Sequence, residues 1–457
     1  MAKARYLLGL YGGKAARLGL RLLRRQGSYL PGMVSDKLDP GFLENLPKPD
    51  RILAVTGTNG KTTTSNMMLD ILSDLETNVV NNSMGSNTKY GILAALSQNV
   101  DLAGRKRSDL AILEVDERWT PFVFPSVKPD ILIITNLYQD SYKRNAHTDF
   151  IRDTIERGLP AGTKLVQNAD CLISSQIGRD HERVFFSIAP LEGEKESRDS
   201  RLKDIRYCPE CGTELTWDFV RYHHLGRAHC PQCGFTNQKA KYTVTKVDAA
   251  ARTVHVDEAG REVVLPMILG TTEAVYNQLA AFAGLREFGL AAETIVSAMA
   301  KIRVVASRFD KVRVGDTSIY TISAKGFNPI ANSRVFDSIR KHPRPKTVIY
   351  ANDDEPGGRY RENLSWLYDT DFQYLAGEDV TRLIVNSWRS GDVVVRALMA
   401  GVPEEKIRAL DDYRRVAELV DLDAPGDVFI LHDIGENSIN EAKYIRDRIA
   451  KRLEESK

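Results

Sequence analysis

Residues 51–65 read RILAVTGTNGKTTTS, and this stretch decides how the first half of the chain folds. The apolar run Ile52–Val55 predicts a strand, and a helix is expected from Thr63. Gly57 and Gly60 permit a tight turn that brings backbone N–H groups towards an anion. Because a helix N-terminus attracts negative charge, this order of strand, turn and helix predicts a nucleotide phosphate site.

Two side chains after the turn carry the chemistry of this predicted site. Lys61 offers a positive charge to β- and γ-phosphates, and the Thr62 hydroxyl is a ligand for Mg²⁺. The loop is shorter than the common G-x-x-x-x-G-K-[ST] form, because Val55 stands five residues before Gly60. A chance Lys-Thr pair after an ordinary turn is the alternative. The predicted nucleotide-binding residues are Gly57, Thr58, Asn59, Gly60, Lys61, Thr62 and Thr63.

An acid follows the apolar run Leu110–Leu113. Glu114 ends this run, and an acid at the carboxyl end of a parallel strand faces the phosphate crevice. We therefore predict that Glu114 joins Thr62 in binding Mg²⁺, with a solvated strand-end acid as the alternative. Asp116 and Glu117 are weaker candidates for the same role.

Composition excludes several classes of protein. The 457 residues predict two to three domains, and a net charge of +2 argues against a nucleic-acid-binding chain. We find no apolar stretch near the roughly 20 residues of a membrane span and no secretory signal. Cysteine usage favours a reducing compartment, so a cytoplasmic location is expected.

Residues 1–30 are basic and partly amphipathic, and the first acid is Asp36. A helix that packs on the main domain and shows a solvated basic face is one interpretation. The other is peripheral contact with an anionic membrane surface at the inner face of the plasma membrane. Both stay open at the level of sequence.

Four of the five cysteines form two CxxC pairs, each followed by glycine and separated by 18 residues. This spacing predicts a closed, structural Zn²⁺ ribbon with the ligands Cys208, Cys211, Cys230 and Cys233. Between the pairs lie His223, His224 and His229, which we interpret as surface histidines of the ribbon, with a role as alternative metal ligands as the other interpretation. Cys171 has no histidine-rich context in the sequence and is expected to be a buried thiol.

Alternating strands and helices from residue 51 onwards indicate a mostly parallel sheet covered on both faces. A second α/β unit is expected from about residue 311, with a further strand at Asp371–Leu375. Arg308 lies at this junction, where an arginine can reach a phosphate or form a structural salt bridge.

The motif at residues 56–64, Glu114, Tyr276-Asn277 and Arg308 together resemble the central domain of the Mur ligase family. The ribbon, the basic N-terminal helix and Ser365-Trp-Leu-Tyr-Asp369 resemble its MurT type, the ligase subunit of lipid II isoglutaminyl synthase. The resemblance implies ATP and Mg²⁺ as cofactors, with Lys61, Glu114 and Arg308 as catalytic residues and Asn277 as an adenine-side contact. It also implies amidation of the α-carboxyl of D-glutamate in the lipid II stem peptide through an acyl phosphate.

The same resemblance implies a GatD-like glutamine amidotransferase partner that supplies ammonia. The family carries an aspartate two residues before Ser-Trp, and Asn363 stands there in this chain. Glu362 or Asp369 are alternatives for the role of that aspartate in the partner's glutaminase site. In a second stretch, at 138–147, only Asp140 and Arg144 match the family. A Mur-type ligase that adds an amino acid and an inactive nucleotide-binding scaffold therefore remain alternative functions.

The predicted fold is a Mur-ligase-type P-loop central domain with an inserted four-cysteine zinc ribbon, followed by a smaller Rossmann-like α/β domain. The predicted domains are a basic helical segment at 1–45, the central domain at 46–310 with the ribbon at about 203–240, and the C-terminal domain at 311–457.

Overall fold

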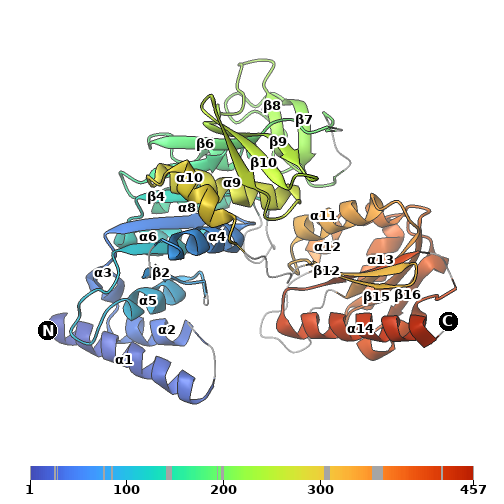
Figure 1. The fold of residues 1–457 in the computed structure, drawn as a ribbon, viewed down its shortest axis with the longest axis horizontal. Coiled ribbons are helices and arrows are strands. Elements are labelled where there is room, and N and C mark those ends of the chain that lie inside the picture. Colours follow the sequence, from blue (N-terminus) through green and yellow to red (C-terminus); the bar gives the residue numbers. More distant parts are fainter. Residues whose placement is uncertain are drawn as a thin grey trace. The chain divides into compact units, whose positions relative to one another are not determined.

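The chain folds as two compact units in the computed structural model (Figure 1). The first unit comprises 1–138, 148–197 and 205–304, and the second comprises the remaining residues. The second unit therefore begins its long segment at Val305, while the three-part division expected from the sequence stays a prediction. The structure describes residues 2–24, 27, 29–75, 78–83, 86–139, 147–192, 194–196, 200–302, 309–351, 364–423 and 426–455.

Within the described part of the first unit lies one nine-stranded sheet of order β11-β10-β9-β6-β5-β4-β1-β3-β2. The strands from β2 to β9 in this order run parallel, and β10 and β11 add an antiparallel edge. The strands are β1 (Arg51–Thr56), β2 (Val79–Asn81), β3 (Leu110–Glu114), β4 (Ile131–Ile134), β5 (Lys164–Asn168), β6 (Arg183–Ile188), β9 (Tyr242–Asp248), β10 (Thr253–Glu258) and β11 (Arg261–Pro266).

Helices cover this sheet because its central strands are apolar along their whole length. Every residue of β3 and β4 is buried. Helix α4 packs on β1 and β3, while α9 packs on β4, β5 and β6. The helices are α1 (Ala2–Leu22), α2 (Tyr29–Leu38), α3 (Phe42–Asn45), α4 (Lys61–Ser73), α5 (Lys89–Gln98), α6 (Thr120–Val127), α8 (Thr148–Gly158), α9 (Thr272–Glu287) and α10 (Ala292–Met299), with the short 3₁₀ turns η1 (Glu117–Trp119) and η2 (Ser174–Gln176).

A small insertion of the first unit carries the two CxxC pairs. Its antiparallel hairpin consists of β7 (Thr216–Tyr222) and β8 (Leu225–His229). The hairpin turns at His223, which adopts a left-handed conformation with φ of 48°. The tip pairs with the main body of the unit through a bridge between Leu225 and Cys171.

The second unit is built on a six-stranded sheet of order β12-β13-β17-β14-β15-β16 within the described residues. All neighbouring pairs except β12–β13 are parallel. The strands are β12 (Phe309–Val314), β13 (Thr317–Ser323), β14 (Lys346–Ala351), β15 (Val380–Asn386), β16 (Ile407–Leu410) and β17 (Asp427–His432). The helices are α11 (Pro329–Arg340), α12 (Ser365–Asp369), α13 (Ser390–Met399) and α14 (Glu436–Glu455), with 3₁₀ turns η3 (Phe372–Leu375), η4 (Glu404–Lys406) and η5 (Tyr413–Leu419).

Two apolar cores lie on opposite faces of this second sheet. Alternate residues of β14 divide between them, since Val348 and Tyr350 join the core with α11 and α13, and Ile349 joins the core with α14. This arrangement is the Rossmann-like unit expected from the sequence. The predicted α/β fold, a P-loop domain followed by a smaller Rossmann-like domain, is confirmed.

One expected strand is wrong. Residues Phe372–Leu375 form the 3₁₀ turn η3, and the strand of this region is β15. Phe372 and Leu375 are fully buried in the core between helices, so an apolar run occurs without sheet pairing. A short apolar run does not distinguish these two kinds of burial.

Candidate active site

The phosphate loop connects β1 to α4, and both of its glycines are required by geometry. Gly57 has φ of 128° and Gly60 has φ of 87°, conformations that L side chains rarely adopt. A Cβ atom at Gly57 would lie 2.3 Å from Thr135 Oγ1, and one at Gly60 would lie 2.0 Å from Asn277 Oδ1. Gly60 is the N-cap of α4 and has no side chain to cap the helix, which leaves its first N–H groups facing the loop.

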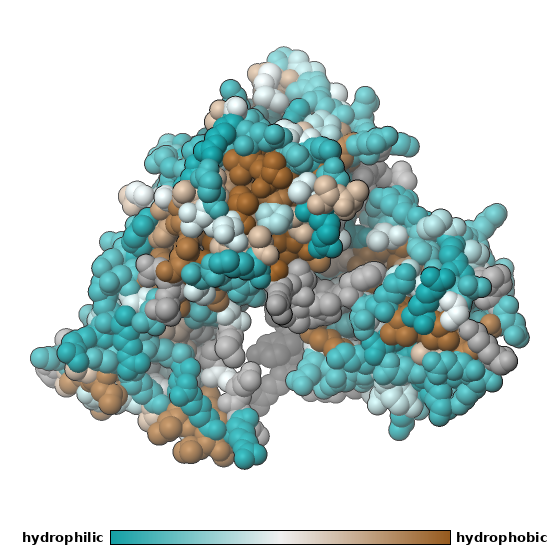
Figure 2. Space-filling model, viewed as in Figure 1, coloured by the Kyte–Doolittle hydropathy of each residue, from teal (hydrophilic) through white to brown (hydrophobic). Residues whose placement is uncertain are grey.

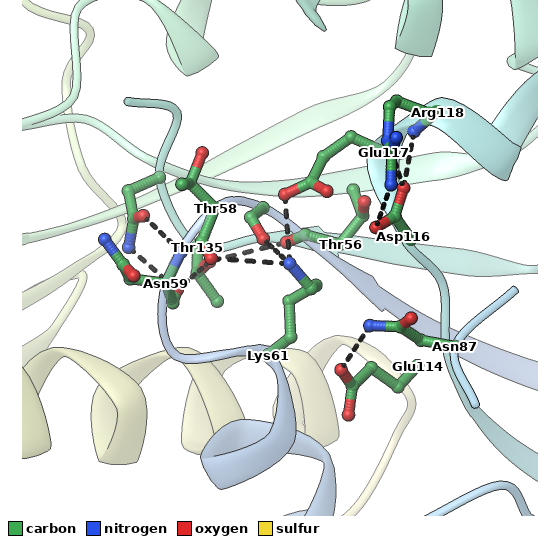
Figure 3. Close-up of polar contacts among 12 residues, drawn as sticks. Thr56, Thr58, Asn59, Lys61, Asn87, Glu114, Asp116, Glu117, Arg118 and Thr135 are labelled. Carbon is green, nitrogen blue, oxygen red and sulfur yellow. Dashed lines mark hydrogen bonds and ion pairs between the residues drawn. The ribbon is translucent and has the colours of Figure 1, made fainter. Parts of the chain in front are cut away.

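A segment after β4 fixes the loop from one side (Figure 3). Asn136 accepts a hydrogen bond from Asn59 N (3.0 Å) at its side chain and another from Thr58 N (2.9 Å) at its carbonyl. Thr135 Oγ1 donates to the Asn59 carbonyl at 2.7 Å. The N–H of Tyr138 donates to Thr58 Oγ1 at 2.9 Å. These contacts hold the loop in one conformation, which lowers the entropic cost of binding an anion.

Lys61 begins α4 and lies in a buried ion pair with Glu117. The distance from Lys61 Nζ to Glu117 Oε1 is 3.0 Å, and the ammonium also donates to the carbonyl of Gly57. Burial alone lowers the pKa of Lys61, but the charges of Glu117, Asp116 and Glu114 outweigh burial, so its pKa is raised and it stays protonated. The pKa of the Glu117 carboxyl is also raised, because burial raises it by more than the charge of Lys61 lowers it. Glu117, a weak candidate in the sequence, is thus the direct partner of Lys61.

Glu114 lies at the carboxyl end of β3, in register with Val55 of β1. Its carboxylate is buried and accepts a hydrogen bond from Asn87 Nδ2 at 3.0 Å. Figure 3 shows Glu114 below Lys61 and apart from Glu117, with Asp116 turned to Arg118. Thr62 is exposed on the first turn of α4. The site therefore offers hard oxygen donors of the kind that Mg²⁺ prefers.

Helix α9 supports the loop from the opposite side. The side chain of Asn277 abuts Gly60, and the preceding Tyr276 donates its hydroxyl hydrogen to Asp170 Oδ2 at 2.6 Å. Arg221 of β7 lies 3.2 Å from the same carboxylate and 2.6 Å from Glu194. All four side chains of this network are buried or nearly so. The sequence carried no signal for Arg221, which lies between the cysteine pairs in no motif.

The four cysteines of the insertion come together as expected. Their Sγ atoms all lie within 4.8 Å of one another. A tetrahedral zinc ion with Zn–S bonds of about 2.3 Å separates thiolates by about 3.8 Å, so the cluster fits such a metal ion. The glycine after each pair has φ of 74°, and its N–H donates to the first cysteine's carbonyl. The four thiolates would fill every position around a tetrahedral metal ion, and zinc is the ion that we propose.

The interpretation of the ribbon histidines is wrong for two of them. His224 is fully buried and His223 nearly so, while His229 is exposed and pairs with Asp218. His224 Nε2 lies 3.3 Å from Cys171 Sγ, so this cysteine has a histidine partner that its sequence neighbours did not show. Burial raises the pKa of the Cys171 thiol, but His224 reverses this and lowers it overall. Because Leu225 pairs with Cys171, the hairpin tip brings the two side chains together.

Several candidates lie outside the described residues, namely Arg308, Asn363, Glu362, Asp140 and Arg144. Asp369 ends α12 and accepts a hydrogen bond from Gln139 Nε2 at 3.3 Å within the second unit. Its role in a partner's site remains a prediction.

The chain matches two family profiles. The Mur ligase middle domain matches residues 55–207, and the MurT ligase C-terminal domain matches residues 326–433. MurT of the lipid II isoglutaminyl synthase (glutamine-hydrolyzing) of Staphylococcus aureus strain COL is 29% identical over 89% of this chain and 91% of that protein. The corresponding Streptococcus pneumoniae subunit is 27% identical over 91% of each chain.

Solved structures agree on the fold. A pseudomurein peptide ligase type C from Methanothermus fervidus superposes with a TM-score of 0.65 at 19% identity, covering 92% of this chain and 83% of that one. MurF ligase from Thermotoga maritima in complex with ADP gives 0.57 at 16% identity, covering 93% and 85%.

The phosphate loop between β1 and α4, the two profile matches and the two relatives support a ligase of the Mur ligase family. Within it the chain is MurT-like, as the C-terminal profile and both relatives indicate.

Proposed function

We propose that the chain is the ATP-dependent ligase subunit of a lipid II isoglutaminyl synthase. In this proposal it amidates the α-carboxyl of D-glutamate in the lipid II stem peptide through an acyl phosphate. The observation that carries the proposal is the coexistence of a preformed phosphate loop around Lys61 with a MurT-type C-terminal domain at 326–433. The two relatives are MurT subunits of a lipid II isoglutaminyl synthase, which supports lipid II as the substrate and isoglutamine formation as the reaction.

The chemistry of amidation suits these side chains. A carboxylate is a poor electrophile, so transfer of the γ-phosphoryl group makes it reactive towards ammonia. Lys61 would exchange its contact with Glu117 for the transferring phosphate, because both are anions that compete for one ammonium. Thr62 and Glu114 would hold Mg²⁺, which supplies charge neutralisation at the phosphates. We assign Arg308 to the same phosphate and Asn277 to the adenine side of the nucleotide.

Ammonia would come from a GatD-like glutamine amidotransferase, and we propose a heterodimer with such a subunit. Four cysteines form the cluster that we propose to hold a zinc ion. Cys171 is paired with a histidine as a glutaminase nucleophile would be, but its exposure is 0%, so it cannot meet glutamine. In this proposal the glutaminase nucleophile lies on the partner subunit. Asn363, Glu362 or Asp369 would complete that partner's site.

The proposal is tested by phosphate release and product mass with the purified chain, ATP, Mg²⁺ and a lipid-linked muropeptide with a free D-glutamate α-carboxyl. We expect amide formation with ammonium, and with glutamine only when a GatD-like subunit is added. Turnover with an amino acid but not with ammonium would replace the proposal with a peptide ligase. Nucleotide binding without any turnover would indicate a scaffold.

A further inference from the structure

Helix α1 turns several large apolar side chains towards solvent, while its Leu10 is fully buried. The exposed side chains follow one another at intervals of four and three residues. They form one exposed stripe along the helix, because this spacing returns to the same helical face. Leu18 is 59% exposed and Leu22 is 77% exposed. The stripe, which we call the outer stripe, consists of Ala4, Leu8, Tyr11, Ala15, Leu18 and Leu22.

The face of α1 that packs on the protein is made largely of small residues. Ser35 of α2 donates its hydroxyl hydrogen to the carbonyl of Gly9 at 2.9 Å. A Cβ atom at Gly13 would lie 2.1 Å from Ser35 Oγ, and one at Gly9 would lie 2.9 Å from the ring of Phe42. The close approach of α1 and α2 thus depends on glycine. The leucines of the outer stripe contribute little to this packing.

The α1–α2 pair is fixed to the body of the first unit. Lys14 donates to the carbonyl of Ser97 in the last turn of α5 (3.2 Å) and to that of Val100 just after the helix (2.6 Å). Lys89 at the start of α5 forms an ion pair of 2.7 Å with Asp36 of α2. The outer stripe is therefore presented on a folded support. Figure 2 shows apolar surface gathered over this N-terminal pair of helices.

The charged side chains of α1 itself are all positive. The chain has no acid before Asp36, and Lys3, Arg5, Arg21 and Arg24 are exposed on α1 or directly after it. A second copy seated on the stripe would bring like charges together. An anionic lipid surface instead offers hydrocarbon for the leucines and phosphate for the arginines. Charge complementarity therefore favours a lipid surface over self-association.

We propose that α1 is an interfacial helix that lies on an anionic lipid surface, with the outer stripe buried among the acyl chains. The exposed side chains Leu23, Tyr29 and Leu30, in the turn and at the start of α2, extend the same apolar region. Among the described residues, no helix combines the length and the apolar character that a membrane span requires. This proposal does not depend on the identity of the amidation substrate.

Vesicle binding of the full chain tests the proposal. Co-sedimentation is measured with phosphatidylglycerol–phosphatidylcholine vesicles and with pure phosphatidylcholine vesicles, without nucleotide or substrate. We expect binding to the anionic vesicles that weakens with salt. The double variant Leu18→Glu with Leu22→Glu should lower the partition coefficient about tenfold or more, since two apolar anchors become anions. Arg21→Glu with Arg24→Glu should lower it on anionic vesicles alone.

Met399→Glu is the matched control, because Met399 is 68% exposed on α13 of the second unit. This variant should bind vesicles like the wild type. Circular dichroism and the thermal midpoint verify that each variant is folded, as expected for exposed positions. Absence of vesicle binding, or equal binding by the leucine double variant, would overturn the proposal. So would a wild-type dimer that the same double variant converts to a monomer, which would assign the stripe to a second copy.

Discussion

The imidazole ring of His224 packs 4.7 Å from the ring of Tyr138. Tyr138 in turn donates its N–H to Thr58 in the phosphate loop. The tip of the ribbon hairpin is therefore two contacts away from the nucleotide site. A second route runs from Arg221 through Tyr276 to Asn277, which abuts Gly60. The insertion that carries the four-cysteine cluster thus braces both sides of the phosphate loop.

Replacing His224 by alanine should weaken nucleotide binding about fivefold, because an aromatic contact of about 1 kcal/mol that positions Tyr138 is lost. Calorimetric titration with ATP and Mg²⁺ measures the affinity. Metal content should be unchanged, since the four thiolates suffice. His229→Ala is the control, because His229 lies on the same hairpin but is exposed. Equal affinities of the two variants would contradict the bracing role.

The double variant Cys208→Ser with Cys233→Ser should lose the bound metal, because only two thiolates of the closed site remain. Elemental analysis of the purified protein gives the metal and its stoichiometry. The hairpin should loosen, and nucleotide affinity should fall at least as far as in His224→Ala. Cys171→Ser serves as the control and should retain metal, since Cys171 lies outside the cluster. Full metal content in the double variant would refute the ribbon assignment.

Lys61→Ala should reduce ATP-dependent turnover at least about a hundredfold, as expected when a charge that stabilises phosphoryl transfer is removed. It also leaves Glu117 buried without its cation. Glu117→Gln separates these effects, because it retains Lys61 and should retain part of the turnover. Lys106→Ala, at a surface ion pair with Asp50, is the neutral control. Unchanged phosphate release in Lys61→Ala would remove this residue from the site.

Gly60→Ala should abolish detectable nucleotide binding, since the new methyl group collides with Asn277 Oδ1 and the left-handed φ costs a further ~1 kcal/mol. Adding Asn277→Ala should relieve the collision and recover part of the lost stability, while the cost of the φ angle remains. Gly104→Ala has a similar φ of 82° with open space around it, and therefore isolates that cost. Thermal unfolding of the three variants measures the cost of the collision and the cost of the left-handed φ angle. Equal stability losses in Gly60→Ala and Gly104→Ala would contradict the collision.

Glu287 at the end of α9 should make stability depend on acid pH. Burial raises the pKa of its carboxyl, but hydrogen bonds from Lys164, Lys241 and Tyr242 outweigh burial and lower the pKa to about 2. A depressed carboxyl pKa stabilises the fold above about pH 4.5, and this contribution is lost as pH falls towards 2. Glu287→Gln should therefore cost up to roughly 3 kcal/mol at pH 7 and much less near pH 3.

Urea unfolding between pH 7 and pH 3 measures this dependence. Glu293→Gln is the control, because the ion pair of Glu293 with Arg261 is solvent-exposed. A pH-independent difference between wild type and Glu287→Gln would show that the carboxylate acts by packing and not by charge.

Much of the fold was predictable because its strands are locally defined. The runs around β1, β3 and β4 are apolar throughout, and only a parallel sheet covered on both faces buries such strands. The strand predicted at Asp371–Leu375 is wrong because the aromatic residues of this stretch are buried between helices in η3. The apolar content of a stretch predicts that it is buried. It does not predict whether a neighbouring strand or a neighbouring helix buries it.

The sequence by itself determined the phosphate loop and the cysteine cluster, because both depend on short-range constraints. Glycines permit the left-handed turns, and CxxC spacing holds two thiolates on one knuckle. Tertiary structure decided the partners of these residues. Glu117 meets Lys61 and His224 meets Cys171 across 56 and 53 residues of chain. Such pairs are set by how parallel strands cross over and where an insertion docks, and no local spacing encodes that geometry.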